Sequence, residues 1–155
     1  MAQAQAPGVK LIAVNKKARH FYLILETLEA GLALTGSEVK SLRGSKVNFK
    51  DGYVRFANGE AFLSGVHISP YENAGYAQHD PDRDRKLLLH EHEIANWKAK
   101  VEQKGLTVVP LKFYFKAGRV KLEIGLARGK NVHDRRDALK ERDLDREAQR
   151  ERDRY

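Results

Sequence analysis

Cysteine is absent from the 155 residues of this chain, and Met1 is its single methionine. Without cysteine the chain can form no disulfide and no thiolate metal site, and it has no cysteine nucleophile. The absence fits a cytoplasmic protein, which is the location we expect. No stretch approaches the roughly 18 apolar residues of a membrane span, and the first ten residues lack the apolar core of a signal peptide. We therefore expect neither a membrane partner nor export.

The signatures of common enzyme classes are missing as well. The sequence holds no G-x-S-x-G, no Walker phosphate loop and no dinucleotide-binding glycine pattern. The acidic residues of segment 80–91 have the spacing of an EF-hand loop, but Arg85 occupies the position where the sharp turn needs glycine. His90 and His92 are two residues apart and diverge on a helix, so they cannot share a metal ion. We expect no enzyme, no cofactor and no metal; a catalytic alternative would require turnover by the isolated protein.

Positive charge is abundant and unevenly placed. The chain has 29 Lys and Arg against 21 Asp and Glu, a net charge of +8. Segment 131–155 contains eight residues of each sign, which leaves 21 basic and 13 acidic residues in 1–130. The whole excess therefore lies in the body, where it attracts polyanions over about 10 Å at 0.1 M salt. For the positive charge taken alone, nucleic acid is the first candidate partner, an anionic membrane is the second, and solubility alone is a third reading.

Apolar runs and turn residues predict the elements of the N-terminal half. The apolar segment Phe21–Leu28 predicts a strand, followed by a turn at 29–31 and a returning strand at 32–35. Thr35 and Glu38 have the spacing of a capping box, which predicts a short helix Glu38–Arg43 that stops at Gly44.

Two hairpins and one long helix are expected in the rest of the body. Asn58-Gly59 tolerates the positive φ angles of a type I′ turn and joins strands 52–57 and 60–69. A polar loop at 70–86 and a helix at 88–104 follow, the helix ending at Gly105. Strands 106–116 and 119–128 form the last hairpin around Ala117-Gly118.

Several short antiparallel strands within about 120 residues suggest a sheet that closes on itself, because closure removes exposed strand edges. We predict a mainly β fold, an OB-like antiparallel barrel with two to three short flanking helices; a split α+β sheet is the alternative. The expected organisation is a disordered leader at 1–10, the barrel at 11–130 and a C-terminal tail at 131–155.

Side-chain alternation assigns the two faces of the last hairpin. Val120, Leu122, Ile124 and Leu126 face the core, which turns Arg119, Lys121 and Glu123 outward, while Lys112, Tyr114 and Lys116 face outward on the partner strand. A two-residue turn places Lys116 opposite Arg119, Tyr114 opposite Lys121 and Lys112 opposite Glu123. Like charges directly opposite destabilise a sheet, and a bound phosphate would relieve this. The alternative is a solvated sheet face with splayed side chains.

The tail has little to bury. Beyond Arg135 its large apolar residues are Leu139, Leu144 and Tyr155, so packing cannot offset the ordering entropy. Written as a helix, it places Arg142, Arg146, Arg150 and Arg154 on one row. We expect a tail that is disordered when free and helical when bound to a polyanion; a solvated single helix is the alternative.

Blocks along nearly the whole chain resemble the SsrA-binding protein family, the small protein B partners of transfer-messenger RNA. They are NKKARH at 15–20, EAGLALTGSEVKSLR at 29–43, DGYVRFANGEAFL, HISPY, HDPDRDRKLLLH, GLTVVPLKFYF and GRVKLEIGLARGKNVHDRRDALKER, in the order of the family. The resemblance implies an OB-type barrel, a tail that becomes helical on the ribosome, and the rescue of ribosomes stalled on messages that lack a stop codon. Arg135 stands where relatives often have lysine, which keeps the charge.

The resemblance also implies an RNA-binding face. By position the face maps to Asn15, Glu29, Glu38, Lys40, Arg43, Leu88 and Lys121. The two carboxylates would accept hydrogen bonds from bases or ribose or organise nearby cations, although turn geometry and helix capping are alternative roles for them. We add the nearby cations and hairpin residues to the expected site: Lys16, Arg19, Lys86, Tyr114, Lys116, Arg119, Arg128 and Lys130.

For the tail, the resemblance implies contact with the ribosome. It places His133 against small-subunit RNA in the decoding centre, where an imidazole ring can stack on a base. The expected contacts along the empty message channel are Arg135, Arg136, Lys140, Arg142, Arg146 and Arg150. Elongation factor Tu is a further candidate partner in the delivery complex. The competing function is a general OB-fold binder of structured RNA or a ribosomal RNA-binding protein.

Overall fold

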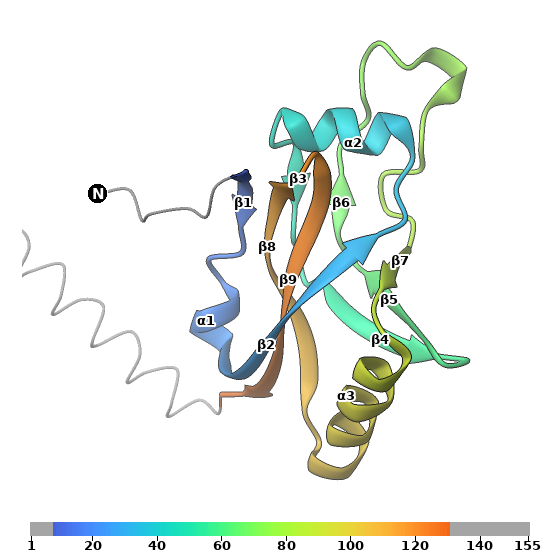
Figure 1. Cartoon of the computed structure of the whole chain (residues 1–155). Coiled ribbons are helices and arrows are strands. Elements are labelled where there is room, and N and C mark those ends of the chain that lie inside the picture. Colours follow the sequence, from blue (N-terminus) through green and yellow to red (C-terminus); the bar gives the residue numbers. More distant parts are fainter. Residues whose placement is uncertain (1–7, 131–155) are drawn as a thin grey trace, which may run out of the picture.

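Antiparallel β-strands are the largest class of secondary structure in the protein, whose structure, a computed structural model, describes residues 8–130. Helices lie at the ends and the side of the sheet that these strands form (Figure 1). The elements in chain order are β1 (Val9–Val14), α1 (Ala18–Phe21), β2 (Tyr22–Leu32), α2 (Gly36–Arg43), β3 (Val47–Asn48), β4 (Tyr53–Ala57), β5 (Glu60–Ser64), β6 (His67–Ile68), the 3₁₀ turn η1 (Gly75–Ala77), β7 (Arg85–Leu88), α3 (Glu91–Lys104), β8 (Thr107–Lys116) and β9 (Arg119–Gly129).

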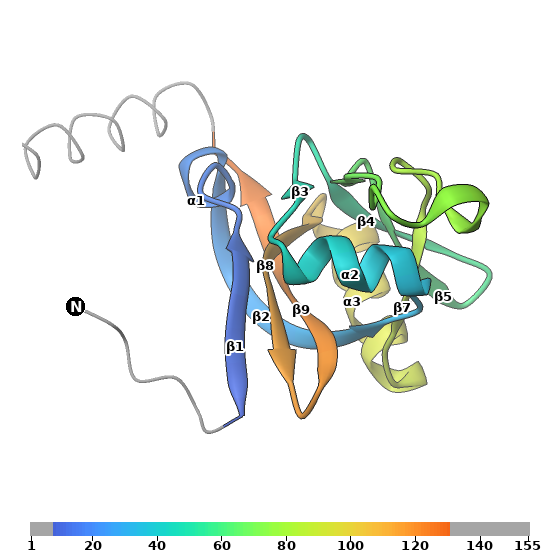
Figure 2. The same cartoon turned by 90° about the horizontal axis from the view of Figure 1, so that it is seen from above.

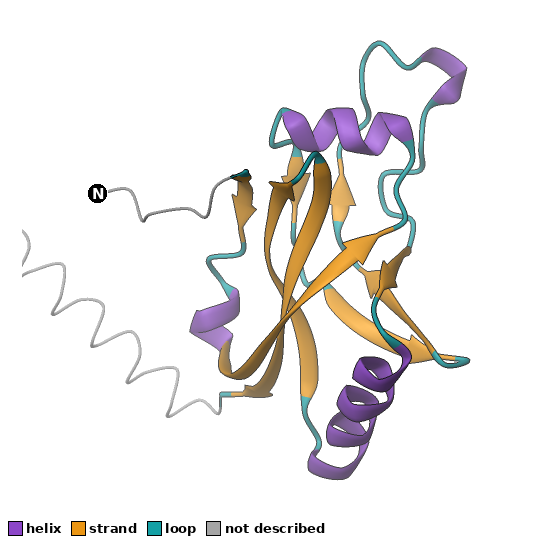
Figure 3. Ribbon diagram, viewed as in Figure 1, coloured by secondary structure: helices purple, strands orange, loops and turns teal. Residues whose placement is uncertain are grey.

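The main sheet closes into a barrel. Its strand order is β1-β8-β4-β5-β7-β2-β9, and β9 pairs back onto β8. Strand β1 joins the outside of this ring through β8, so the closed part contains the other six strands. The strands wrap around a common interior, as Figure 3 shows. The predicted mainly β, OB-like antiparallel barrel with short flanking helices is confirmed.

The barrel interior is filled by the inward face of the last hairpin and by the two longer helices. Leu122 and Ile124 of β9 have no exposed surface, and Phe113 of β8 packs against Phe49 with ring centroids 5.4 Å apart. Trp97 of α3 and Leu42 of α2 are buried in the same core. Helix α2 lies across one end of the barrel, which Figure 2 views from above, and α3 lies at the opposite end.

Both hairpin turns and the helix cap follow the sequence prediction. Asn58 and Gly59 have φ of 54° and 74°, and Ala117 and Gly118 have φ of 51° and 77°. Both turns therefore have the left-handed backbone of a type I′ hairpin. The predicted pairing of β8 with β9 is confirmed in all three pairs. The capping box of α2 is also present, with Thr35 as its N-cap.

Strand β2 differs from its prediction, because it runs without a turn through residues 29–31. Glu29, Ala30 and Gly31 all pair with β9, and Gly31 also pairs with Leu88 of β7. Partners on both sides hold this segment extended, although Glu-Ala-Gly by itself resembles a turn.

Other element boundaries also move. The polar loop expected at 70–86 contains η1 and ends in β7, which pairs with β5 and β2. Helix α3 begins at Glu91 after an N-cap at His90, so Leu88 belongs to β7 and not to the helix. The strand expected at 60–69 is interrupted at Gly65, whose φ is +76°. Strand β1 begins at Val9, within the segment 1–10 expected to be a disordered leader.

Candidate nucleic-acid interface

A single cross-strand row brings together several of the predicted RNA-binding residues. Leu88 of β7 pairs with Gly31 of β2, Gly31 with Lys121 of β9, Lys121 with Tyr114 of β8, and Tyr114 with Leu11 of β1. We call these five residues the central row. Three of them, Leu88, Lys121 and Tyr114, were predicted from positions that lie far apart in the sequence. The barrel closure is what places them side by side.

Gly31 opens the space in which the Lys121 side chain lies. A Cβ atom at Gly31 would stand 3.2 Å from the Cβ of Leu88 and 3.6 Å from the Nζ of Lys121, so a larger residue would crowd both neighbours. Lys121 is half-buried and forms no ion pair with any residue between 8 and 130. The nearby Glu29 interacts with it electrostatically, but an ammonium group that forms no ion pair can accept a phosphate without breaking one. Leu88 is 53% exposed beside it and offers an apolar contact.

Tyr114 is not the exposed aromatic that strand alternation predicts. Its side chain points to the outward face of β8, yet the residue is only 7% exposed and its hydroxyl donates a hydrogen bond to Glu29. Burial, reinforced by this carboxylate, raises the pKa of Tyr114. The ring is therefore covered and cannot serve as a base-stacking platform; its role is to hold Glu29.

Glu29 in turn organises the cations of the hairpin. The hydrogen bond from Tyr114 and the neighbouring Lys116 and Lys121 hold the pKa of Glu29 below its ordinary value, although burial opposes them. Its carboxylate lies 3.3 Å from the Nζ of Lys116. Lys116 thus has an internal partner, and the repulsion between Lys116 and Arg119 needs no phosphate to relieve it. The argument that a phosphate is needed to relieve this repulsion is therefore corrected. Arg119 itself is exposed at the turn and forms no ion pair within residues 8–130.

A groove of about 600 Å³ borders the central row on the side of β7 and α3. Lys86 and Lys121 line it together with Leu88. Four carboxylates also line it: Glu29, Glu60, Glu91 and Glu93. Lys86 forms an ion pair with Glu60 at 2.9 Å, and both side chains are about half exposed. An exposed pair of this kind is worth little, so Lys86 can exchange Glu60 for a phosphate at low cost.

Glu38 does not reach the surface, which corrects its prediction as an RNA-contacting residue. Its side chain has no exposed area. Its carboxylate accepts hydrogen bonds from Arg83, from the Thr35 backbone and, at 2.7 Å, from the fully buried Arg85. Burial opposes ionisation, but these donors outweigh it and hold the pKa of Glu38 below its ordinary value. Glu38 therefore fixes α2 to the start of β7 and to the segment before it, which agrees with its alternative roles in capping and in organising cations.

Lys40 and Arg43 are exposed on α2 at the end of the barrel. The Nζ of Lys40 lies 5.4 Å from the centre of the Tyr71 ring, and the guanidinium of Arg43 lies 5.9 Å from that of Phe115. Both cations are presented on a rigid helix, and the Arg43 contact places α2 next to the hairpin of β8 and β9.

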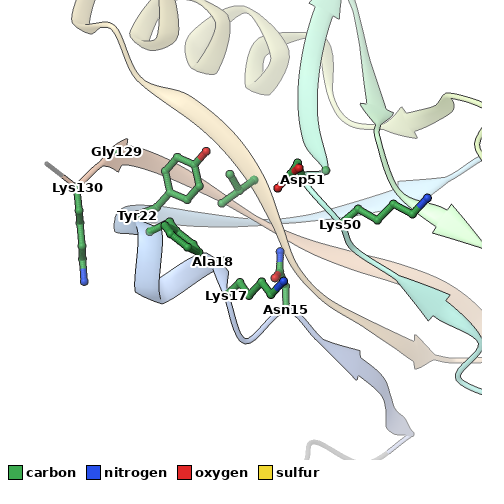
Figure 4. Close-up of a pocket in the computed structure, with 11 residues that line it drawn as sticks. Asn15, Lys17, Ala18, Tyr22, Lys50, Asp51, Gly129 and Lys130 are labelled. Carbon is green, nitrogen blue, oxygen red and sulfur yellow. The ribbon is translucent and has the colours of Figure 1, made fainter. Parts of the chain in front are cut away.

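A second group of predicted residues surrounds α1. Two of them, Asn15 and Lys130, line a pocket of about 330 Å³ together with Lys17 and Tyr22 (Figure 4). The side-chain amide of Asn15 donates to the backbone carbonyl of Pro110 at 2.8 Å, which fixes its orientation. The Nζ of Lys130 donates to the backbone carbonyl of Arg19 at 3.0 Å.

The α1 group and the central row are separate surfaces. Lys16, Arg19 and Arg128 are exposed near α1, where Arg128 pairs across strands with Leu23. Gly129 lies eight positions after Lys121 in β9, which corresponds to about 25 Å along the strand. The structure thus divides the predicted surface between two ends of one hairpin (Figure 1).

Gly31 and Lys17 belong to these surfaces but were missed by sequence reasoning. A glycine inside an apolar strand can signal a close approach of neighbouring side chains. Gly31 was instead read as part of a turn. Lys17 follows Lys16 directly, so charge alone could not distinguish them.

The acidic residues of segment 80–91 are used individually. Asp82 lies near His67 and Lys50, and Asp84 forms an ion pair with Arg55 at 2.8 Å. Between residues 8 and 130, no three His, Asp or Glu side chains are grouped closely enough to hold a metal ion. No helix in the same range has the length and apolar character needed to cross a membrane.

Comparison with known proteins decides the family. A family model described as SmpB protein matches residues 12–154. The chain belongs to the SmpB protein family. Relatives named SsrA-binding protein include that of Solidesulfovibrio magneticus, 68% identical over 148 residues that cover 96% of each chain, and that of Enterococcus hirae, 54% identical over 141 residues that cover 91% of this chain and 92% of the relative.

A solved SmpB structure shares the fold. It is described as "tmRNA-SmpB: a journey to the center of the bacterial ribosome", is 53% identical in sequence, and has a TM-score of 0.67 over 82% of this chain and 93% of that one. The predicted tail residues lie outside the described range: His133, Arg135, Arg136, Lys140, Arg142, Arg146 and Arg150.

Proposed function

We propose that this SmpB-family protein binds the tRNA-like domain of transfer-messenger RNA and delivers that RNA to stalled ribosomes. The relatives are named for binding SsrA RNA, and the solved relative is described with transfer-messenger RNA and the ribosome. Residues 1–130 carry the excess positive charge, and in the central row Lys121 offers one of these charges to an RNA phosphate. The protein performs no chemistry of its own in this process; peptide transfer belongs to the ribosome.

The position of Lys121, exposed to the groove and without an ion pair in residues 8–130, is the observation that supports this proposal most strongly. Lys121 stands in the middle of the sheet face, unpaired within the described residues, with the open backbone of Gly31 on one side. RNA helices are recognised mainly through phosphates and 2′-hydroxyls, and a cation at a fixed place on a rigid sheet suits that task. We expect the carboxylate of Glu29, which Tyr114 holds, to accept a hydrogen bond from a ribose hydroxyl or a base.

The tail completes the proposal. Segment 131–155 would enter the decoding centre with His133 and follow the empty message channel with its arginines, in place of a codon–anticodon pair. Elongation factor Tu would accompany the complex in the cytoplasm. The α1 group lies where the chain leaves the barrel, because the backbone N–H of Lys130 donates to the carbonyl of Phe21 at 2.9 Å.

Salt dependence of RNA binding tests the central row. Lys121→Glu should weaken binding of the tRNA-like domain and reduce the slope of log affinity against log salt by about one, because one fewer counterion is released. The matched control is Lys104→Glu, an exposed lysine at the end of α3, which should leave the slope unchanged. Equal slopes for wild type and Lys121→Glu would remove Lys121 from the phosphate contacts.

The competing function, general binding of structured RNA, predicts a different competition result. Excess unrelated tRNA should displace a general binder from transfer-messenger RNA, but it should not displace a protein that recognises the tRNA-like domain. Full displacement by an unrelated structured RNA would favour the general binder.

A further inference from the structure

The loop between β6 and β7 is built to present its tip. The backbone N–H of Tyr71 donates to the side-chain oxygen of Gln78 at 3.0 Å, and the side-chain amide of Gln78 donates back to the carbonyl of Tyr71 at 2.7 Å. Turn hydrogen bonds within the loop join Ala74 to Tyr71 and Ala77 to Ala74. These bonds close segment 71–78 into a small ordered unit, which rises beyond α2 in Figure 1.

A buried histidine fixes the base of this unit. His79 is 7% exposed, and its two ring nitrogens lie 2.8 Å from the hydroxyl of Ser37 and 2.8 Å from the carbonyl oxygen of Ile68. Ser37 belongs to α2 and Ile68 to β6, so His79 ties the loop to both elements. These two hydrogen bonds therefore fix the base of the loop to α2 and β6.

The fixed loop exposes one aromatic ring. Tyr76 is fully exposed and is the most exposed large hydrophobic side chain in residues 8–130. It lies in η1, directly after Gly75, whose φ of +58° suits glycine better than most residues with a side chain. The hydrogen bonds of the loop thus fix the backbone around Tyr76, although its ring packs against no other part of residues 8–130.

The surroundings of Tyr76 favour RNA over protein. Lys40 of α2 lies over the Tyr71 ring of the same loop, and the carbonyl of Lys46 accepts a hydrogen bond from Ser69 at the start of the loop. The loop itself carries one acidic residue between 71 and 79, Glu72. Its other residues are small or polar, so no apolar rim surrounds the ring as the core of a protein interface would require. An exposed aromatic ring on a fixed loop whose base contacts a lysine is an arrangement on which unpaired bases stack.

We propose that Tyr76 stacks on an unpaired base of the RNA that the barrel binds, so that this loop is a second contact beyond the central row. The proposal rests on the proposed function, since the barrel must hold the same RNA. The ligand is a single-stranded nucleotide of transfer-messenger RNA, recognised through the face of its base and, by Lys40, through its phosphate.

Affinity measurements on the full chain test this contact. Tyr76→Ala should weaken binding of intact transfer-messenger RNA by about five-fold or more, the loss typical of one stacked base. Tyr76→Phe keeps the ring and should bind like the wild type. His79→Ala loosens the loop and should act in the same direction as Tyr76→Ala. The matched control is Tyr53→Ala, which removes another exposed ring, on β4. Wild-type affinity in Tyr76→Ala would overturn the proposal.

Ultraviolet crosslinking identifies the partner of the ring. We expect the peptide that contains Tyr76 to carry a nucleotide of transfer-messenger RNA after irradiation of the complex, with and without ribosomes. A crosslink only to a ribosomal protein or to ribosomal RNA would overturn the assignment. Lys121→Glu measured in parallel separates the two proposals: if it weakens binding and Tyr76→Ala does not, only the loop contact fails.

Discussion

Glu38 and Lys121 show how burial separates two charged residues that a resemblance places on one surface. The Glu38 carboxylate is enclosed by Arg83, Arg85 and the N-cap of α2, whereas the Lys121 ammonium has no ion-pair partner among residues 8–130. A buried charge that is already paired would lose these donors by turning outward. Glu38 therefore acts inside the protein and supports the elements that carry Lys40 and Leu88.

Glu38→Gln tests this internal role. The change leaves the Arg85 guanidinium buried without its counterion, so we expect a loss of about 3 kcal/mol in the free energy of unfolding, measured by urea denaturation at pH 7. Glu60→Gln is the matched control, because the pair of Glu60 with Lys86 is half exposed and should contribute less than about 1 kcal/mol. Equal losses in the two variants would contradict the assignment.

The same carboxylate predicts an acid dependence of stability. The pKa of Glu38 is lowered in the folded protein from its ordinary value of 4.5. The folded state then binds fewer protons than the unfolded state, so the contribution of Glu38 is present above pH 4.5 and is lost as the pH falls through the lowered pKa. Unfolding followed between pH 7 and pH 3 should show a smaller acid loss in Glu38→Gln than in the wild type. A loss of the same size would show that other carboxylates dominate, such as Glu29 or Asp84.

At the scale of elements, the two type I′ turns form a natural pair. Asn58-Gly59 and Ala117-Gly118 have nearly the same backbone angles, but alanine is a poor residue for a φ of 51° whereas asparagine tolerates it. Ala117→Asn should therefore stabilise the protein by about 1 kcal/mol, and Asn58→Ala should destabilise it by a similar amount. Chemical denaturation of both variants gives the two values. Loss of stability in Ala117→Asn would mean that the hairpin between β8 and β9 requires another turn.

Local chemistry explains which elements the sequence could predict. The last hairpin and its register followed from alternation and a two-residue turn, both of which are properties of neighbouring residues. The extended course of β2 through Gly31 could not be predicted from neighbouring residues, because it depends on pairing with strands about 57 and 90 residues further along the chain. Strand β7 is short and joins α3 almost directly, so its apolar residues resembled the start of the helix.

The candidate site divides in the same way. Lys121 could be predicted from the hairpin pattern alone. The burial of Tyr114 could not, because its partner Glu29 lies 85 residues away. The enclosure of Glu38 by Arg83 and Arg85 likewise depends on the tertiary fold. Charge and motif predicted which residues belong to the RNA-binding surface. The closed barrel determines which of those residues face outward and which are paired within the protein.

At the scale of the whole molecule, the balance of charge predicts a division of labour between body and tail. Segment 131–155 has eight basic and eight acidic residues, so it adds no net charge to the body. Counterion release on RNA binding should then come mainly from residues 1–130. Deletion of 131–155 should leave the affinity for the tRNA-like domain and its salt slope nearly unchanged.

The same deletion should abolish peptide tagging on stalled ribosomes, because nothing would then occupy the decoding centre. His133→Ala in the full-length chain is the finer test, since it removes one ring from the tail and leaves its charge balance intact. It should reduce tagging in a reconstituted translation assay without changing RNA affinity. A large loss of affinity in the truncated protein would show that the tail helps to grip the RNA. Full tagging activity in the truncated protein would show instead that the barrel alone engages the ribosome.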